Sequence, residues 1–233
     1  MAAAGSGQRL VGAGGPKAFV ELAGRPMVEW SIEALRGAGS VGEIVVAAPP
    51  GAEHEHEFTG GDLFVVAGGE MRAESVRNGL ERVETELVAI HDAARPLLTA
   101  ELVEEVIAAL VADPGADGAI AAAPVSDTIK RAAPRSRSAF ASLEGANAHL
   151  AVEETVDRAE LWAAQTPQVF RVETLRRALE ADPEAVAAAT DEAMLVEAAG
   201  GRVLIHPAPA ANIKVTTPLD LRVAELLLAE RDG

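Results

Sequence analysis

Short apolar runs alternate with amphipathic stretches along most of the chain. The runs are closed by glycine, proline or an acidic residue, which is typical of buried strands. They predict strands over residues 43–48, 63–66, 87–90, 118–125, 203–206 and 212–215. Between them, apolar residues at three- and four-residue spacing predict helices over residues 26–36, 72–83, 172–180, 191–199 and 218–231. Thr99 and Thr190 are placed to accept hydrogen bonds from the first turns of two helices, the first of them starting directly after Thr99.

The alternation of strands and helices predicts the fold class. Strands joined by helices pair in parallel through right-handed crossovers, which gives an open, twisted α/β sheet with helices packed on it. Ligands bind to such sheets outside the carboxyl ends of the strands. The turn after residue 4, Gly68 with Gly69, and Asp92 all lie at predicted strand ends. We therefore expect these distant segments to meet at one edge of the sheet.

The pattern changes over residues 126–158. Short β-like pieces at 128–132 and 154–156 flank a middle that is rich in Ser, Arg, Gly and Asn. We interpret this segment as a β-hairpin arm that leaves the sheet, and a surface loop is the alternative. Residues 160–164 then predict a short helical turn. No repeat or linker divides the chain, so residues 1–233 are expected to form a single domain with the arm attached.

Composition narrows the classes of function. The 233 residues are 49% hydrophobic, and 36 acidic against 20 basic side chains give a formal charge of −16. This charge argues against a nucleic-acid partner, because such binding needs a basic face. The chain has no cysteine, shows no signal-peptide pattern at its start, and has no apolar run of the ~20 residues that span a membrane. We expect a soluble, cytoplasmic protein without a membrane or nucleic-acid partner.

The first seventeen residues carry the first candidate chemistry. Gly5 and Gly7 flank Ser6 in a turn of small residues, and the cations Arg9 and Lys17 follow. Backbone N–H groups in such a turn form a concavity that binds anions, and two cations would neutralise a polyphosphate. A plain terminal loop is the alternative. The Gly-Lys-Ser/Thr ending of a P-loop is absent. For the dinucleotide fingerprint only residues 1–4 precede the turn, and Glu21 and Glu29 are at best candidates for the ribose-binding acid.

Two further segments follow predicted strands. A glycine turn at Gly68 and Gly69 precedes a helix that carries Arg72 and Ser75 three positions apart, which suits an anion or a polar ligand edge. An ordinary strand–turn–helix connection is the alternative. Asp92 ends another strand, where a carboxylate opposite a phosphate loop could hold Mg²⁺. An Asp–Arg ion pair that orders the loop is the alternative there.

Taken in order, these segments and five later ones resemble the 2-C-methyl-D-erythritol 4-phosphate cytidylyltransferase family, over nearly the whole chain. The matching segments are residues 3–9, 16–17, 68–75, 91–96, 123–130, 154–158, 161–170, 190–193 and 212–216. The resemblance implies a Rossmann-like, mostly parallel sheet with helices on both faces and a protruding β-hairpin arm. It implies a reaction in which CTP and methylerythritol phosphate give the CDP-alcohol and pyrophosphate. It also implies a homodimer in which the arms at about 126–158 interlock and complete each other's sites.

The resemblance also implies roles for individual residues. Arg9 and Lys17 would stabilise the triphosphate and the transition state, while Arg158 and Lys214 would orient the attacking phosphate. Asp92 would support Mg²⁺, and Thr128 and Arg95 would hold the methylerythritol part, with Thr128 and Arg158 acting in the partner's site. The remaining binding residues would read the base and ribose or line the site; they are Ala3, Ala4, Gly5, Ser6, Gly7, Gly69, Arg72, Ser75, Ala93 and Thr166. The attacking phosphate oxygen is already ionised at neutral pH, so positioning and charge neutralisation would carry the catalysis.

Two departures from the family pattern stand out. The family has a full apolar strand before the glycine turn, whereas here at most residues 1–4 remain, so either the chain start is placed too late or the strand is truncated. Residues 145–151 also lengthen the expected arm. Three alternatives stay open: a pentitol-phosphate (ribitol 5-phosphate) cytidylyltransferase, a nucleotide-dependent oxidoreductase and a non-catalytic nucleotide-binding protein. His54 and His56 lie in an acidic stretch that resembles metal-ligand material, but a solvated loop is the simpler interpretation.

Overall fold

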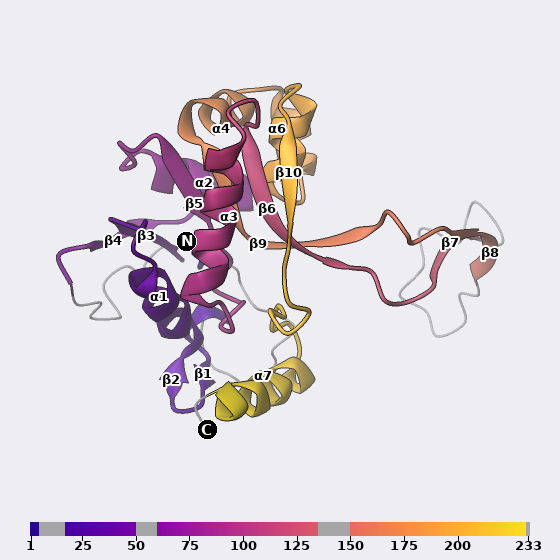
Figure 1. The fold of residues 1–233 in the computed structure, drawn as a ribbon, viewed down its shortest axis with the longest axis horizontal. Coiled ribbons are helices and arrows are strands. Elements are labelled where there is room, and N and C mark those ends of the chain that lie inside the picture. Colours follow the sequence, from indigo (N-terminus) through magenta and orange to yellow (C-terminus); the bar gives the residue numbers. More distant parts are fainter. Residues whose placement is uncertain (5–16, 50–59, 135–149, 232–233) are drawn as a thin grey trace. The chain divides into compact units, whose positions relative to one another are not determined.

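The computed structural model describes residues 1–4, 17–49, 60–134 and 150–231 (Figure 1). The chain forms two compact units. The first comprises Met1–Ala122 and Ala164–Gly233, and the second comprises Ala123–Ala163. In the described residues no helix combines the length and the apolar character needed to cross a membrane.

The first unit contains the strands that the apolar runs predicted over residues 43–48, 63–66, 87–90, 118–125 and 203–206, and three further strands, β1 (Glu21–Leu22), β2 (Arg25–Pro26) and β9 (Trp162–Arg171). The predicted strands are β3 (Ile44–Ala48), β4 (Leu63–Ala67), β5 (Leu87–Ile90), β6 (Gly118–Pro124) and β10 (Val203–Pro207). Strand β3 pairs in parallel with β4, and a four-stranded sheet has the order β10-β6-β9-β5. Strand β10 is parallel to β6, whereas β9 is antiparallel to β5. The predicted mostly parallel sheet is therefore confirmed, with one antiparallel strand that the pattern did not reveal.

The first residues of the chain join the β3–β4 pair to the four-stranded sheet. Ala2 forms parallel bridges to Ala47 in β3 and to Asp92, two residues beyond the end of β5. The amine of Met1 donates to the carbonyl oxygen of Val45 at 2.6 Å, and burial lowers its pKa from 8.0 to about 6. Residues 1–3, which are what remains of the expected first strand, therefore lie between β3 and residues 91–93 and are held by a few backbone hydrogen bonds.

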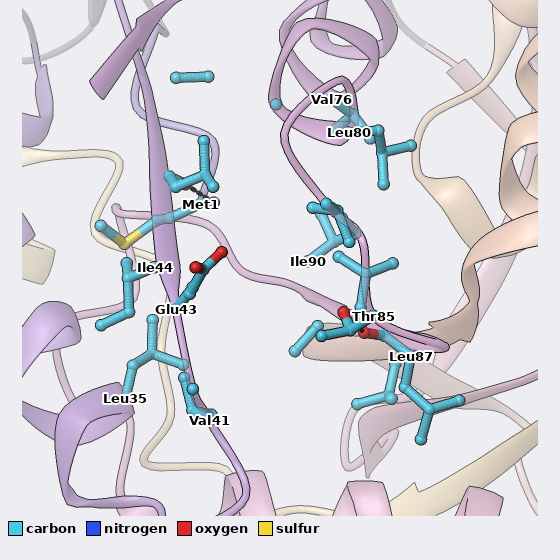
Figure 2. Close-up of a pocket in the computed structure, with 18 of the residues that line it drawn as sticks. Met1, Leu35, Val41, Glu43, Ile44, Val76, Leu80, Thr85, Leu87 and Ile90 are labelled. Atoms are coloured by element: carbon cyan, nitrogen blue, oxygen red, sulfur yellow. Dashed lines mark hydrogen bonds between the residues drawn. The ribbon is translucent and has the colours of Figure 1, made fainter. Parts of the chain in front are cut away.

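A cavity of ≈ 230 Å³ adjoins Met1 in the first unit. Figure 2 shows Ile44 and Leu35 on one side of it and Ile90 and Leu87 on the other, so that β3 and β5 both contribute to its lining. By the same measure one water molecule needs roughly 10–15 Å³. The cavity is therefore larger than an ordinary packing defect, and it is distinct from the charged residues that gather beyond the end of β5.

Helices pack on both faces of the sheet, as predicted. They are η1 (Lys17–Phe19), α1 (Met27–Gly37), α2 (Arg72–Leu80), α3 (Ala100–Ala112), α4 (Val172–Leu179), α5 (Pro183–Ala188), α6 (Glu192–Ala198) and α7 (Pro218–Arg231). Successive residues of a strand point to opposite faces. In β6, Ala119 and Ala121 join the core with α1 and α3, whereas Ile120 joins the core with α2, α4 and α6. A third cluster packs α7 against β1 and the start of α1.

Local signals were correct in some places and wrong in others. Thr99 caps α3 by accepting from the amide of Leu102, as predicted. Helix α6 is capped by Asp191 and not by Thr190, because the Asp191 carboxylate accepts from the amide of Met194. The prediction of a helical turn over residues 160–164 is wrong, since β9 begins at Trp162.

The prediction of a strand over residues 212–215 is also wrong. The backbone there leaves the sheet: the amide of Val215 donates to the carbonyl of Ala94, and the carbonyl of Asn212 accepts from Arg95. The apolar side chains of Ile213 and Val215 pack in the cluster that includes α7. An irregular segment therefore carries the alternating pattern that a strand would show.

The second unit contains β7 (Ile129–Pro134) and β8 (Leu150–Val156), which pair antiparallel with Ile129 opposite Val156. An irregularity interrupts the pairing between Arg131 and Ala132. Among the residues of this unit whose burial is described, Ala123 alone is buried, and Val152 is 63% exposed. This two-stranded element has little core of its own.

Candidate functional site

Charged and polar side chains of the first unit meet beyond the carboxyl ends of β4 and β5. Arg72 begins α2 after the glycine turn that follows β4, and Asp92 directly follows β5. Lys214 comes from the segment before α7, and Glu192 begins α6. The sheet edge therefore gathers segments from four places in the chain, as expected for a doubly wound fold.

Asp92 is the centre of this cluster. One of its carboxylate oxygens accepts from Nη1 of Arg72, and the other lies 2.7 Å from Nζ of Lys214. Burial alone would raise the pKa of Asp92, but the charges of Arg72 and Lys214 outweigh burial and hold the pKa well below its usual range. Asp92 is therefore an ionised, largely buried carboxylate between two cations.

Arg72 connects Asp92 to a second, deeper carboxylate. Its Nε lies 3.1 Å from Oε1 of Glu192, and its Nη2 lies 2.8 Å from Oε2. The Glu192 side chain is 1% exposed. Burial raises the pKa of Glu192 and the guanidinium of Arg72 opposes that rise, while the two carboxylates together raise the pKa of Arg72 against the effect of its own burial.

The neutral side chain of His91 is connected to Asp92 through the hydroxyl of Thr166. The amide of Asp92 donates to Oγ1 of Thr166 at 3.1 Å, and Oγ1 lies 3.0 Å from Nδ1 of His91. The hydroxyl can thus donate to Nδ1, and Nε2–H can donate to the carbonyl of Arg95 at 3.2 Å. Burial lowers the pKa of His91 from 6.5 to about 3. His91 therefore orders this corner through hydrogen bonds and carries no charge at neutral pH.

Arg95 and Asn212 tie the Lys214 segment to the sheet. Nη1 of Arg95 donates to the carbonyl of Asn212 at 2.7 Å. The side-chain Nδ2 of Asn212 donates to Oε1 of Gln165 and to the carbonyl oxygen of Thr166, both at 2.9 Å. Burial lowers the pKa of Arg95. The segment that carries Lys214 is therefore anchored close to that lysine, at a buried position.

The turn between β4 and α2 brings backbone close to the start of the chain. A Cβ at Gly68 would collide with Cβ of Ala4 and would lie 2.9 Å from the carbonyl oxygen of Ala48. Oγ of Ser75 accepts from the amide of Gly69 at 3.0 Å. Glycine is required at position 68 by this close approach, and Ser75 fixes the turn.

The structure brings several of the sequence-predicted site residues together and leaves others apart. Arg72, Asp92, Arg95, Thr166 and Lys214 share one connected cluster. The predicted residues Ala3 and Ala93 lie beside it, since the amide of Ala93 donates to Ala2 and that of Ala3 to Ala47. Lys17 lies in η1.

The remaining predicted positions are not part of this cluster as described. Gly5, Ser6, Gly7 and Arg9 fall outside the described residues, as do His54 and His56 of the acidic stretch. Thr128 and Arg158 belong to the second unit, where Nη1 of Arg158 donates to the carbonyl of Ser126. Their predicted roles therefore stay predictions.

Sequence reasoning gave no role to two residues that the structure places at the site. Glu192 pairs with Arg72 across 120 positions of sequence, and Asn212 anchors the Lys214 segment. An acidic residue in the first turn of an apolar helix was a visible signal at Glu192, but it is equally typical of ordinary helix capping. Its partner could not be read from the sequence.

The donor set fits one kind of metal site. Within the described residues no group of three or more His, Cys, Asp or Glu side chains could hold an ion by itself. Mg²⁺ is commonly held by one or two carboxylates together with the phosphates of a substrate. Asp92 fits that role if an ion replaces one of the two cations that now contact it.

The fold and the cluster define an α/β protein with a cluster of charged side chains at the carboxyl edge of its sheet, where such folds bind ligands. Residues 1–230 match the family described as IspD: 2-C-methyl-D-erythritol 4-phosphate cytidylyltransferase. The chain is 41% identical over 237 residues to the protein of that name from Rubrobacter xylanophilus, with 99% of this chain and 94% of the relative covered. This chain therefore belongs to the IspD family of nucleotidyltransferases.

Other comparisons agree with this placement. The chain is 43% identical over 233 residues to the bifunctional enzyme IspD/IspF of an Anaeromyxobacter species, with 98% of this chain covered, but it spans about half, 56%, of that relative's length. The crystal structure of 2-C-methyl-D-erythritol 4-phosphate cytidylyltransferase from Thermus thermophilus matches with a TM-score of 0.75 and 34% identity. That match covers 93% of this chain and 95% of the solved one.

Proposed function

We propose that this protein transfers the cytidylyl group of CTP to 2-C-methyl-D-erythritol 4-phosphate and releases pyrophosphate. A phosphate oxygen of the acceptor attacks the α-phosphorus of CTP, the new P–O bond forms, and the bond to the β-phosphate oxygen breaks as pyrophosphate leaves. Both reacting groups are anions, so the site must neutralise charge and align the reactants. Membership of the IspD family supports this reaction.

The observation that carries the proposal is the ion pair between Asp92 and Lys214 beside Arg72. It places a carboxylate and two cations at the carboxyl edge of the sheet, where the fold binds ligands. Lys214 is 44% exposed along its side chain, so its ammonium can leave Asp92 for an acceptor phosphate. Arg9 and Lys17 would neutralise the triphosphate.

A divalent cation, Mg²⁺ in our proposal, would be held by Asp92 and by the phosphates of CTP. When bound it would supply positive charge to the triphosphate and orient it. The chain itself supplies the remaining functions. Arg72 keeps Asp92 in place, Lys214 orients the acceptor phosphate, and the turn at Gly69, fixed by Ser75, offers backbone groups to the nucleoside.

The second unit supports a homodimer as part of this proposal. A two-stranded hairpin is marginally stable by itself, and the described face of β8 leaves Leu150 and Val152 exposed. A second copy of the arm would cover these side chains. Thr128 and Arg158, which lie in this unit, would then act in the partner's site. We propose the cytoplasm as the compartment, since the reactants are soluble phosphates.

Pyrophosphate release tests the proposed function. Wild-type protein should release pyrophosphate with CTP, Mg²⁺ and methylerythritol phosphate, and should release far less when ATP replaces CTP or ribitol 5-phosphate replaces the acceptor. Lys214→Ala should lose most of this activity. Arg202→Ala is the matched control, because it removes an exposed cation that pairs with Asp113 away from the cluster.

Each alternative predicts a different outcome of that experiment. Release with ribitol 5-phosphate in preference to methylerythritol phosphate would contradict the proposed acceptor. Binding of CTP without release from any pair would favour a protein that binds a nucleotide and does not catalyse. Equal activity in Lys214→Ala and wild type would remove Lys214 from the mechanism.

A further inference from the structure

Four alternating charges run through the site from its buried side to its exposed side. Glu192 contacts Arg72, Arg72 contacts Asp92, and Asp92 contacts Lys214. Their formal charges sum to zero. The exposed fractions of the outer two side chains differ widely, at 1% for Glu192 and 44% for Lys214. One end of the series is therefore fixed in the protein and the other end is accessible to solvent and ligands.

The fixed end is held by geometry as well as by charge. Glu192 takes the Nε and Nη2 edge of Arg72 with both of its carboxylate oxygens, and such bidentate pairs fix the orientation of the guanidinium. Glu192 also lies in the first turn of α6, where the helix dipole stabilises a negative charge. The neighbouring residues Ala193, Leu195 and Val196 pack in the core. Glu192 has no need to move when ligands bind.

The exchangeable end is the pair between Lys214 and Asp92. The lysine side chain is 44% exposed, so solvent competes for its ammonium, and its many rotamers favour exchange of this contact. When Lys214 turns towards an acceptor phosphate, the remaining groups, Glu192, Arg72 and Asp92, carry a net charge of −1. That net charge would lie at the carboxylate of Asp92, whose side chain is 9% exposed, and it could accept a cation.

We propose that Glu192 is a positioning residue that keeps Asp92 able to bind a divalent cation. Glu192 neutralises Arg72. The negative charge of Asp92 is then available to pair either with Lys214 or with the metal ion. Without that carboxylate, Arg72 would neutralise Asp92 alone, and the net charge at the exchange point would be zero. This inference rests on the proposed function, because it assumes a nucleotide with a divalent cation at Asp92.

Glu192→Gln tests the inference, since it keeps the shape of the side chain and removes its charge. Calorimetry measures the affinity of the protein for CTP without metal and with Mg²⁺. The ratio of these two affinities gives the coupling between nucleotide and metal binding. We expect the coupling to fall by about tenfold or more in Glu192→Gln, equal to about 1.4 kcal/mol. CTP should bind at least as tightly as to wild type when no metal is present.

Asp191→Asn is the matched control. It also removes one negative charge and disturbs the start of α6, because Asp191 caps that helix and accepts from Gln168. The hydrogen bonds of the Asp191 carboxylate go to Gln168 and Met194 and not to Arg72. A variant that merely loosens α6 should therefore lose thermal stability and keep the coupling. Loss of coupling in Asp191→Asn to the same extent as in Glu192→Gln would overturn the inference.

A double variant keeps the test decisive if the single one folds poorly. Glu192→Gln with Arg72→Met removes both members of the buried pair, so that no uncompensated charge stays in the interior. Once Lys214 leaves, Asp92 again carries a net charge of −1. The inference predicts that Mg²⁺ coupling in the double variant exceeds that in Glu192→Gln. Equal or lower coupling in the double variant would overturn it.

Failure of this inference and failure of the proposed function give different results. Wild-type protein that binds CTP with Mg²⁺ coupling but releases no pyrophosphate contradicts the reaction and leaves the role of Glu192 standing. Normal turnover with unchanged coupling in Glu192→Gln contradicts the role of Glu192 alone. Absence of CTP binding to wild type contradicts both.

Discussion

The ammonium of Lys214 lies 2.7 Å from Oδ2 of Asp92. In the proposed reaction a divalent cation held by Asp92 would compete with Lys214 for this carboxylate. Lys214 would also orient the acceptor phosphate, so its departure from Asp92 and the arrival of the cation would be coupled events.

This competition predicts that two kinetic quantities decrease together in Lys214→Ala. The maximal rate should fall by about 10²-fold or more, which is the usual effect of removing one group that stabilises developing charge. The Mg²⁺ concentration for half-maximal activity should decrease, because the competitor at Asp92 is gone. Titration of activity with Mg²⁺ at saturating CTP measures both. An increased Mg²⁺ requirement would contradict the competition.

Gly68→Ala should damage the turn between β4 and α2. The added Cβ would collide with Ala4 and crowd the carbonyl oxygen of Ala48, which costs about 1–3 kcal/mol of unfolding free energy for overpacking of this kind. Gly79→Ala in α2 is the control, since its Cβ would meet nothing nearer than 3.9 Å and alanine favours a helix by up to ~1 kcal/mol. Urea unfolding compares the two. Equal stability of both variants would contradict the close approach at Gly68.

His91 should make stability depend on pH. Its pKa is about 3 in the folded protein and near 6.5 in an unfolded chain, so the unfolded state binds more protons between these values. The contribution of His91 to the free energy of unfolding should therefore have its full value above about pH 6.5 and fall as the pH falls towards 3. Each unit of pKa difference corresponds to about 1.36 kcal/mol. Asp92, whose pKa is depressed, adds a loss below about pH 4.

Variants separate the contribution of His91 from the rest. His91→Asn should flatten the pH dependence between about pH 4.5 and 6.5, above the range where Asp92 acts. His206→Asn, at the half-buried histidine that faces Glu105, should keep it. Denaturant unfolding at several pH values provides the measurement. An unchanged slope in His91→Asn would show that His91 is not the group responsible.

Asn212→Ala should affect stability and catalysis together. It removes two hydrogen bonds and leaves the buried Oε1 of Gln165 and carbonyl of Thr166 without these donors, which costs about 1–3 kcal/mol. The segment that carries Lys214 would lose its anchor, so activity should fall more than for a surface variant such as Arg202→Ala. Thermal unfolding and turnover test the two effects. Full activity with reduced stability would show that Lys214 is positioned without Asn212.

The sequence was sufficient for the regular elements with uninterrupted patterns. Strand β5 matches its predicted range, and α7 begins and ends where Pro218 and the amphipathic stretch indicated. Strand β9 was missed because Gln165, Thr166 and Gln168, all buried, interrupt its apolar pattern. Those polar residues form hydrogen bonds to Asp92, Asp191 and Asn212, so the residues that hid the strand are the ones that connect it to the candidate site.

The site could be predicted in part, and for a physical reason. Asp92 and Gly69 were found because strand ends and glycine turns leave local signals. The pairing of Arg72 with Glu192 leaves none, since it joins residues 120 positions apart that are brought together by the core shared by α2, α4 and α6. The contact of Arg72 with two carboxylates, which sets the charge balance at Asp92, is seen in the folded structure and not in the sequence.

The most direct test of the central claim is identification of the product. Wild-type protein incubated with CTP, Mg²⁺ and methylerythritol phosphate should yield a pyrophosphate diester with two coupled phosphorus resonances, together with one equivalent of pyrophosphate, by phosphorus NMR. Asp92→Asn should give neither signal at a comparable rate. Unchanged CTP and acceptor resonances with folded wild-type protein would contradict the claim that this site transfers a cytidylyl group.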